Sequence, residues 1–256
     1  MCRWAAYIGE PIFLEDVVTA PCQSLMRQSL HARESKTETN GDGFGMAWYG
    51  ARDVPGTYRD VLPAWADPNL QSLAHQVQAR CFLAHVRAST GGATSRTNCH
   101  PFTAGRWSFM HNGQIGGFRQ FRRTADMAID ERYYHHRQGT TDSEALFLIA
   151  LGEGLEDDPR GALERATGRL ERLSRDMGET PHLRMTAAFT DGHTLYAARY
   201  ASDEHAPSLY AGATCRGWAV VSEPLGLDHS GWQRIEPGQF IAVTGAGMAV
   251  RGFRPV

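Results

Sequence analysis

Cys2 is the residue of this sequence best suited to chemistry, because it directly follows the initiator methionine. Its side chain is small, so we expect removal of Met1, which would leave a thiol and a free α-amine on one residue. A thiol has an ordinary pKa of about 8.5 and an α-amine of about 7.7–8.0, so the amine could accept the thiol proton at neutral pH. Cys2 is therefore a candidate nucleophile that carries its own base. The alternative is a small buried residue in an N-terminal strand.

A second group of candidate side chains lies in the stretch AHVRASTGG, residues 84–92. Arg87 stands where a strand expected over residues 80–87 gives way to a loop. Its guanidinium could bind a carboxylate through two parallel hydrogen bonds, and the hydroxyl of Thr90 could add another donor. Taken by itself, Arg87 is more typical of a surface arginine.

The stretch MHNGQIG, residues 110–116, offers two further hydrogen-bond donors. Asn112 has a side-chain NH₂ group, and Gly113 has a backbone N–H that a substrate can approach closely because glycine has no side chain. Together they could form an oxyanion hole. The competing interpretation is a type I′ hairpin turn, for which Asn-Gly is the favoured pair. By itself, this pair favours the turn.

The stretch TTDSEAL, residues 140–146, predicts the start of a helix. Thr141 is the expected N-cap, and Glu144 three residues later completes a capping box. Asp142 then falls in the first helical turn, where a carboxylate stabilises the helix through its dipole. The functional alternative is that Asp142 binds a substrate ammonium group.

These motifs together resemble the N-terminal glutaminase domain of class II glutamine amidotransferases, which belong to the N-terminal nucleophile hydrolases. Each motif is weak alone, but all four occur in the family's order and approximate spacing. They are Cys2; R-x-x-T-x-G, with Arg87, Thr90 and Gly92; H-N-G, with His111, Asn112 and Gly113; and T-D-S/T-E, with Thr141, Asp142 and Glu144. The resemblance spans roughly residues 2–240. It implies a four-layer αββα fold.

The resemblance also implies a catalytic role for three residues. Cys2 would attack a γ-carbonyl carbon with the help of its own α-amine, and Asn112 and Gly113 would donate hydrogen bonds to the oxyanion. The products would be a thioester on the enzyme and ammonia or an amine, and water would then release glutamate.

Substrate binding is implied for three other residues. Arg87, helped by Thr90, would bind the α-carboxylate of a small-molecule γ-glutamyl substrate, while Asp142 would bind its α-amino group. The family's usual basic residue before the Gly-x-Asp segment is replaced by Asn40, so the surroundings of Cys2 are expected to differ.

Among the members of this family, the small stand-alone ones are the most similar. They include uncharacterised bacterial amidotransferase-like proteins and the γ-glutamyl hydrolase of ergothioneine biosynthesis, and the patterns MCRxxxYxG, DGxGxxWY and GRWxFxHNG recur in them. The synthetic members carry a second domain that consumes ammonia. Here we expect one domain over residues 2–256, with any ammonia-accepting synthase on another chain.

The elements that must position these residues are predicted from hydrophobic patterning. Short strands come first, then two helices with an apolar face, and then short strands again from residue 184, with Asp-Gly at 191–192 as a hairpin signal. This order predicts an α+β fold with mostly antiparallel sheets. The ranges are 3–8, 43–49, 80–87 and 106–111 for the early strands, and 141–153 and 159–177 for the helices.

Composition excludes several other classes of function. The formal net charge of −2 provides no basic surface for nucleic acid. The sequence lacks an apolar run of about 18 residues and a signal peptide, so we expect no membrane association and a cytoplasmic location. The five cysteines are scattered and never spaced CxxC, which favours reduced thiols. No cofactor is expected, because GDGFG at 41–45 lacks the third glycine of a dinucleotide motif.

Histidines leave two further alternatives open. His85, His100 and His111 could converge only through the fold, so neither a metal site nor a papain-like Cys–His pair is favoured. A different class of function is a non-catalytic γ-glutamyl-binding or regulatory subunit that keeps the fold. Intact mass would separate that class from the enzyme, because retention of Met1 would turn the nitrogen of Cys2 into an amide and remove the base.

Overall fold

Two antiparallel β-sheets form the centre of the computed structural model, which describes residues 2–35, 37–89 and 94–256. The first sheet has seven strands in the order β11-β9-β10-β1-β4-β2-β3. Its strands are β1 (Arg3–Phe13), β2 (Phe44–Tyr49), β3 (Gly56–Asp60), β4 (Gln78–Val86), β9 (Tyr210–Thr214), β10 (Gly217–Val221) and β11 (Trp232–Arg234).

The second sheet has six strands in the order β13-β12-β8-β7-β6-β5, again with antiparallel neighbours. Its strands are β5 (Phe102–Ala104), β6 (Trp107–Ile115), β7 (Leu183–Thr190), β8 (Leu195–Ala201), β12 (Gln239–Thr244) and β13 (Gly247–Gly252). The loop between β7 and β8 contains Asp191 and Gly192, so the predicted hairpin is confirmed.

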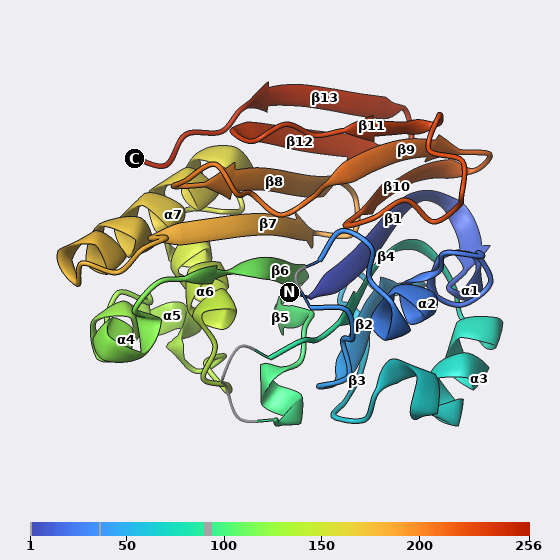
Figure 1. Cartoon of the computed structure of the whole chain (residues 1–256), viewed down its shortest axis with the longest axis horizontal. Helices are drawn as coiled ribbons and strands as arrows, with labels where there is room; N and C mark the ends of the chain where they lie inside the picture. Colours follow the sequence, from blue (N-terminus) through green and yellow to red (C-terminus); the bar gives the residue numbers. More distant parts are fainter. Residues whose placement is uncertain (1, 36, 90–93) are drawn as a thin grey trace.

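Helices cover the outer face of each sheet, as Figure 1 shows. Beside the first sheet lie α1 (Glu15–Val18), α2 (Leu25–Leu30) and α3 (Pro68–Gln76), and beside the second lie α4 (Phe118–Asp126), α5 (Glu131–Tyr134), α6 (Asp142–Gly152) and α7 (Pro159–Asp176). Two 3₁₀ turns, Ala64–Ala66 and Arg96–Asn98, complete the elements of the described residues. The result is a helix–sheet–sheet–helix sandwich, and the predicted four-layer fold is confirmed.

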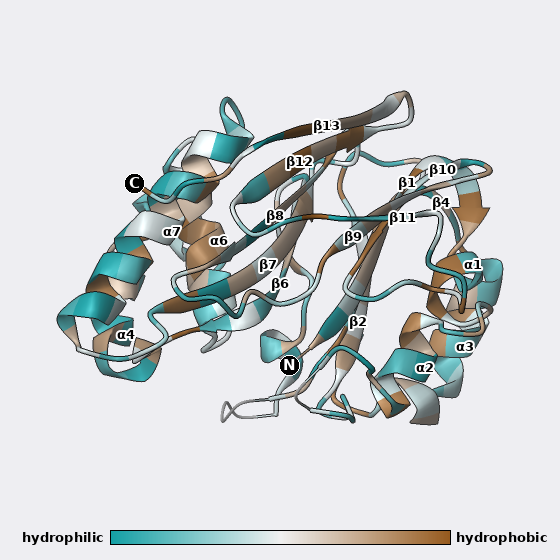
Figure 2. Cartoon of the chain, turned by 45° about the horizontal axis from the view of Figure 1, so that its top comes forward, coloured by the Kyte–Doolittle hydropathy of each residue, from teal (hydrophilic) through white to brown (hydrophobic). Residues whose placement is uncertain are grey.

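Three hydrophobic clusters correspond to the three contacts between these layers. Strand β1 takes part in two of them: Ala5 and Tyr7 pack on the α1–α3 side, whereas Trp4, Ala6 and Ile8 pack between the sheets. This alternation follows from the two-residue period of a strand, and burial on both faces explains why the first strand is an almost continuous apolar run. In Figure 2 the ribbons of α7 and α4, on the outer side of the molecule, are coloured as hydrophilic over much of their length.

The structure refines several of the predicted elements. The strand predicted over 3–8 continues to Phe13 beyond a register shift between Ile8 and Ile12, and the strand predicted over 106–111 continues to Ile115. The helices predicted at 141–153 and 159–177 correspond to α6 and α7. Among the described residues, no helix is both long enough and apolar enough to span a membrane.

Candidate active site

A cavity of about 410 Å³ opens between the two sheets and the start of α6. Residues from several distant parts of the sequence line it, and they include Cys2, Arg87, Gly113 and Asp142. Figure 1 shows the N-terminus at the middle of the molecule, and β1 packs against β6. The fold therefore gathers these four predicted residues around one cavity.

Cys2 lies one residue before β1 and is half-buried. Its thiol donates to the carbonyl oxygen of Ala88 over 3.5 Å, and the N–H of Ala88 donates to the sulfur over 3.4 Å. Burial raises the pKa of the Cys2 thiol, although the hydrogen bond at Ala88 and the positive charges of Arg87 and Arg3 act in the opposite direction. The thiol therefore rests protonated and needs a base to become a nucleophile.

Arg87 directly follows β4 and is only 5% exposed, so the alternative of a surface arginine is wrong. Its Nη1 donates to the carbonyl oxygen of Asp42 over 3.3 Å, and its Nη2 donates to the Ser89 hydroxyl over 3.2 Å. The backbone of Arg87 is also held, because its N–H donates to Gly43 and its carbonyl oxygen accepts from the N–H of Asp42. Thr90, the predicted helper of Arg87, lies outside the described residues, as does Gly92.

Asn112 and Gly113 lie inside β6, where they pair with Thr186 and Met185 of β7. The alternative of a hairpin turn at Asn-Gly is therefore wrong. Gly113 has a φ of +153°, and a Cβ at this position would lie 1.8 Å from the carbonyl oxygen of Arg184, so only glycine fits. Gly113 lines the cavity, whereas Asn112 is fully buried, with its side chain on the inter-sheet side of the strand by alternation with Met110.

Asp142 begins α6, and its carboxylate is held by backbone donors. The N–H of Ile115 donates to Oδ2 over 2.9 Å and the N–H of Ser143 donates to Oδ1 over 2.8 Å. These two bonds fix a negative charge that faces the cavity from the N-terminal end of the helix.

The predicted capping box at this helix is only half present. The Thr141 hydroxyl accepts from the N–H of Glu144 over 3.2 Å, as expected of an N-cap. The Glu144 carboxylate instead accepts from the N–H groups of Gln138 and Gly139 and pairs with Arg137 over 2.9 Å. Glu144 therefore secures the loop before α6, which helps to hold Asp142 at the cavity.

Three buried histidines meet beside these residues. The rings of His85 and His100 stack with centroids 4.2 Å apart, and His100 and His111 line the cavity. Burial lowers the pKa of His85 to about 3 and lowers the pKa values of His100 and His111 as well. Within the described ranges, no group of histidine, cysteine and acidic side chains could hold a metal ion.

His111 is linked to Asp142 through Ser143. Its Nε2 donates to the carbonyl oxygen of Arg184 over 3.4 Å, which leaves Nδ1 to accept from the Ser143 hydroxyl over 2.8 Å. Sequence reasoning missed this contact and the stacking of His85 on His100. The sequence offered one signal for these contacts: His85 lies two residues before Arg87, and His111 lies directly before Asn112.

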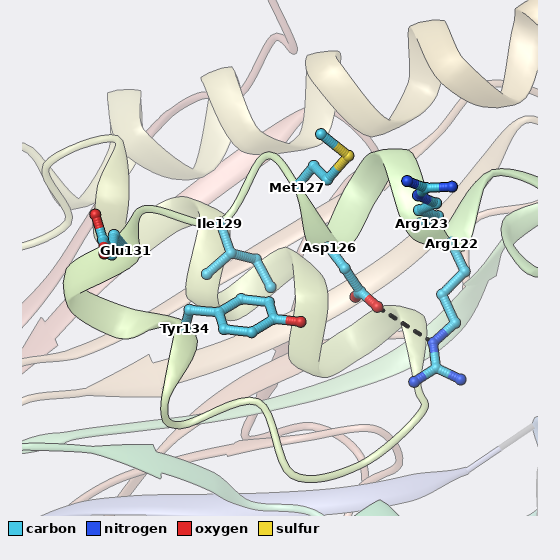
Figure 3. A pocket seen from close by; sticks show the side chains of 7 residues that line it. All are labelled: Arg122, Arg123, Asp126, Met127, Ile129, Glu131 and Tyr134. Atoms are coloured by element: carbon cyan, nitrogen blue, oxygen red, sulfur yellow. Dashed lines mark ion pairs between the residues drawn. The ribbon is translucent and has the colours of Figure 1, made fainter.

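A second hollow, of about 570 Å³, lies on the outer side of the molecule beside α4 and α5. Figure 3 shows Met127, Ile129 and Tyr134 around it, together with an ion pair between Arg122 and Asp126. The residues that line it include no thiol, hydroxyl of serine or threonine, or histidine. Of these two hollows, only the cavity at Cys2 is lined by a thiol and by histidines.

Comparison with known proteins agrees with this arrangement. The family described as "Glutamine amidotransferases class-II" matches residues 13–207. The chain belongs to the class II glutamine amidotransferases. The predicted resemblance is thus confirmed over most of the chain, and the match covers Arg87, Asn112, Gly113 and Asp142 but begins after Cys2.

Two relatives of this amidotransferase span most of its length. The probable glutamine amidotransferase DUG3 of Saccharomyces cerevisiae is 34% identical over 88% of this chain and 70% of its own length. The gamma-glutamyl-hercynylcysteine sulfoxide hydrolase of Mycolicibacterium smegmatis is 28% identical over 98% of this chain and 99% of its own. The chain is accordingly an amidotransferase-like enzyme.

Solved structures show the same fold. A glutamine aminotransferase class-II domain protein from Silicibacter pomeroyi superposes with a TM-score of 0.80 at 51% identity, over 99% of this chain and 100% of that one. The glutamine phosphoribosylpyrophosphate amidotransferase of B. subtilis superposes with a TM-score of 0.64 at 15% identity, over 99% of this chain and 49% of that one. The second likeness is one of fold alone.

Proposed function

We propose that this chain is an N-terminal cysteine amidohydrolase that cleaves the γ-glutamyl amide bond of glutamine or of a γ-glutamyl conjugate. The observation that carries the proposal is the single cavity lined by the Cys2 thiol, the Arg87 guanidinium and the Asp142 carboxylate. The amino-acid end of a γ-glutamyl substrate carries a carboxylate and an ammonium group. Arg87 and Asp142 offer these two groups charges of opposite sign beside the Cys2 thiol.

The first half of the reaction forms a thioester. Once Met1 has been removed, the α-amine of Cys2 accepts the thiol proton, and the sulfur attacks the γ-carbonyl carbon. The oxyanion accepts hydrogen bonds from the Asn112 amide and the Gly113 N–H, and losing one such donor costs about 10²–10³ in rate. The protonated α-amine then gives its proton to the leaving nitrogen, and the C–N bond breaks.

The second half of the reaction releases glutamate. Water attacks the thioester carbon while the α-amine takes its proton, and the C–S bond breaks to regenerate the thiol. Arg87, with Thr90, holds the α-carboxylate and Asp142 holds the α-ammonium throughout, so the γ-carbon stays beside Cys2. The relative named for hydrolysis of a γ-glutamyl conjugate supports an amine as well as ammonia as leaving group.

The proposed substrate is a small molecule. We place the whole activity in one domain over residues 2–256, because β1 near the N-terminus and β12 near the C-terminus share the core between the sheets. Ammonia released from glutamine could leave freely or pass to a synthase on another chain. Accumulation of free ammonia in equal amount to glutamate would favour simple hydrolysis.

A glutamate-release screen tests the proposal. The purified protein is incubated with glutamine and with γ-glutamyl amides that differ only in the leaving amine, and Cys2→Ala serves as the matched control. We expect glutamate from at least one donor with the wild type and none with the variant. Calorimetric binding of a donor without glutamate release would instead support a non-catalytic γ-glutamyl-binding subunit.

A further inference from the structure

Five buried side chains between the two sheets have polar atoms that find no hydrogen-bond partner within the described part of the chain. Each of these residues is at most 4% exposed. The atoms are Trp4 Nε1, both ring nitrogens of His85 and of His100, both amide atoms of Asn112, and Thr186 Oγ1. We call these five residues the inner polar cluster.

The register of the strands brings the members of the cluster together. Trp4 of β1 pairs with His85 of β4, and Asn112 of β6 pairs with Thr186 of β7. Strands β4 and β6 pack against each other across the gap between the sheets. His85 also stacks on His100, which lines the cavity at Cys2. The cluster therefore extends from the cavity inward.

Unpartnered polar atoms are rare inside proteins, because each costs free energy when it is removed from water without a new partner. The proposed function assigns the Asn112 NH₂ to the oxyanion during turnover, and the other seven atoms favour an occupant that can both donate and accept hydrogen bonds. A neutral imidazole offers one donor and one acceptor, an amide offers both, and an indole only donates. A small molecule between them would find the two to four partners that a buried water typically has.

The charge of the surroundings disfavours a cationic occupant. Burial lowers the pKa of His85 to about 3 and also lowers the pKa of His100, so both rings are neutral at physiological pH. The neighbouring groups whose positive charge acts on these two rings are the guanidinium groups of Arg87, Arg3 and Arg59 and the imidazole of His111, and a positive charge on any of them repels a cation. The cluster itself contains no carboxylate that could balance a positive charge.

We propose that the inner polar cluster is a binding site for a small uncharged hydrogen-bonding molecule, water or ammonia, at the back of the Cys2 cavity. The existence of this site follows from the positions of the unpartnered atoms, whereas the role of the bound molecule in turnover rests on the proposed function. In that role it holds the water that enters the deacylation step, or the ammonia that leaves in the acylation step.

A crystal structure of the wild type at high resolution tests the site directly. We expect ordered density within about 2.7–3.2 Å of at least two of the eight polar atoms. Its loss is expected in Thr186→Val, which removes one hydroxyl with little change of volume, and in His100→Phe, which keeps an aromatic ring. The exposed His193→Phe is the control and should keep the density. Absence of any such density in the wild type overturns the proposal.

Kinetics with γ-glutamyl p-nitroanilide then test the role in turnover. Release of p-nitroaniline reports formation of the thioester, and release of glutamate reports its hydrolysis. If the site supplies water, Thr186→Val keeps the initial burst of p-nitroaniline but lowers the steady rate of glutamate release, by about tenfold for one lost hydrogen bond of ordinary strength. An unchanged steady rate of glutamate release in Thr186→Val overturns the role in supplying water.

Added ammonia distinguishes the two occupants. If the site binds ammonia, glutamine formation from the same anilide saturates with ammonia in the wild type and rises linearly in the variants. If it binds water only, the dependence on ammonia is linear in all of them. A wild type that releases neither product contradicts the proposed function instead, and the crystallographic result still decides whether the site exists.

Discussion

The backbone N–H of Ser89 donates a 2.7 Å hydrogen bond to the carboxylate of Asp42. Asp42 also donates from its own N–H to the carbonyl oxygen of Arg87, and its carbonyl oxygen accepts from Arg87 Nη1. Through these contacts Asp42 holds the segment that carries the Arg87 guanidinium at the cavity. Asp42 is therefore a positioning residue for the proposed carboxylate-binding arginine.

Replacing Asp42 by alanine should weaken substrate binding more than it slows the chemical step. The change leaves the Ser89 N–H without its acceptor, at a cost of about 1–3 kcal/mol, which corresponds to roughly a 5- to 150-fold rise in KM. Steady-state kinetics with the best γ-glutamyl donor measure this, and Asp53→Ala at an exposed site is the control. A fall in kcat at unchanged KM would contradict the positioning role.

Cys2→Ala should abolish glutamate release, because no other residue replaces the nucleophile. All five cysteines are free thiols, and burial raises the pKa of Cys81 to about 12 and also raises that of Cys99. A glutamine-mimicking electrophile should therefore add one mass adduct, on Cys2, in protein whose intact mass lacks Met1. An adduct on Cys81 or Cys99 would favour unspecific thiol chemistry, and full activity of Cys2→Ala would exclude the mechanism.

Asp142→Ala should mainly raise KM, because the proposed partner of the substrate ammonium is lost while Cys2 is untouched. We also expect a loss of stability of at least about 1–3 kcal/mol, since the N–H groups of Ile115 and Ser143 lose their acceptor at the start of α6. Kinetics and thermal unfolding of the same preparation separate the two effects. A KM equal to that of the wild type would remove Asp142 from the binding site.

Gly113→Ala should unfold the protein or destabilise it strongly. The added Cβ would meet the Arg184 carbonyl oxygen at 1.8 Å, and the φ of +153° is unfavourable for alanine. The clash involves backbone on both sides, so β6 and β7 would have to separate. Gly245→Ala is a matched control, because a Cβ there meets nothing within 4 Å. Equal melting temperatures of the two variants would contradict the close approach.

Stability should fall as the pH is lowered from about 6.5 towards 5. The pKa of His85 is about 3 in the folded chain and about 6.5 in the unfolded one, so the unfolded state binds more protons in this window. Each such histidine contributes up to about 1.4 kcal/mol per pH unit, and the lowered pKa values of His100 and His111 act in the same direction. Urea unfolding at several pH values measures the slope, which His85→Phe should reduce. A slope that the variant leaves unchanged would show that His85 is protonated in the folded state.

Much of the fold could be predicted because several local sequence patterns form the structures that they indicate. The short apolar run around Trp4 and the N-cap at Thr141 indicated β1 and α6, and the charged pair Glu171–Arg175 forms across one turn of α7 at 2.9 Å. Helix α4 was not predicted. Its segment is rich in arginine, and only the burial of Phe118 and Phe121 against the core makes it part of the fold.

By itself, the sequence determined which residues could do chemistry and their order: Cys2, Arg87, Asn112 with Gly113, and Asp142. Only the tertiary structure decided which element holds each of these residues and which side chains it meets. Asn-Gly favours a turn locally, but pairing with β7, some seventy residues later, keeps it in a strand. In the same way, His85 and His100 stack only because a strand and a loop meet between two sheets. These outcomes depend on contacts between distant segments, and such contacts leave no periodic signal in the chain.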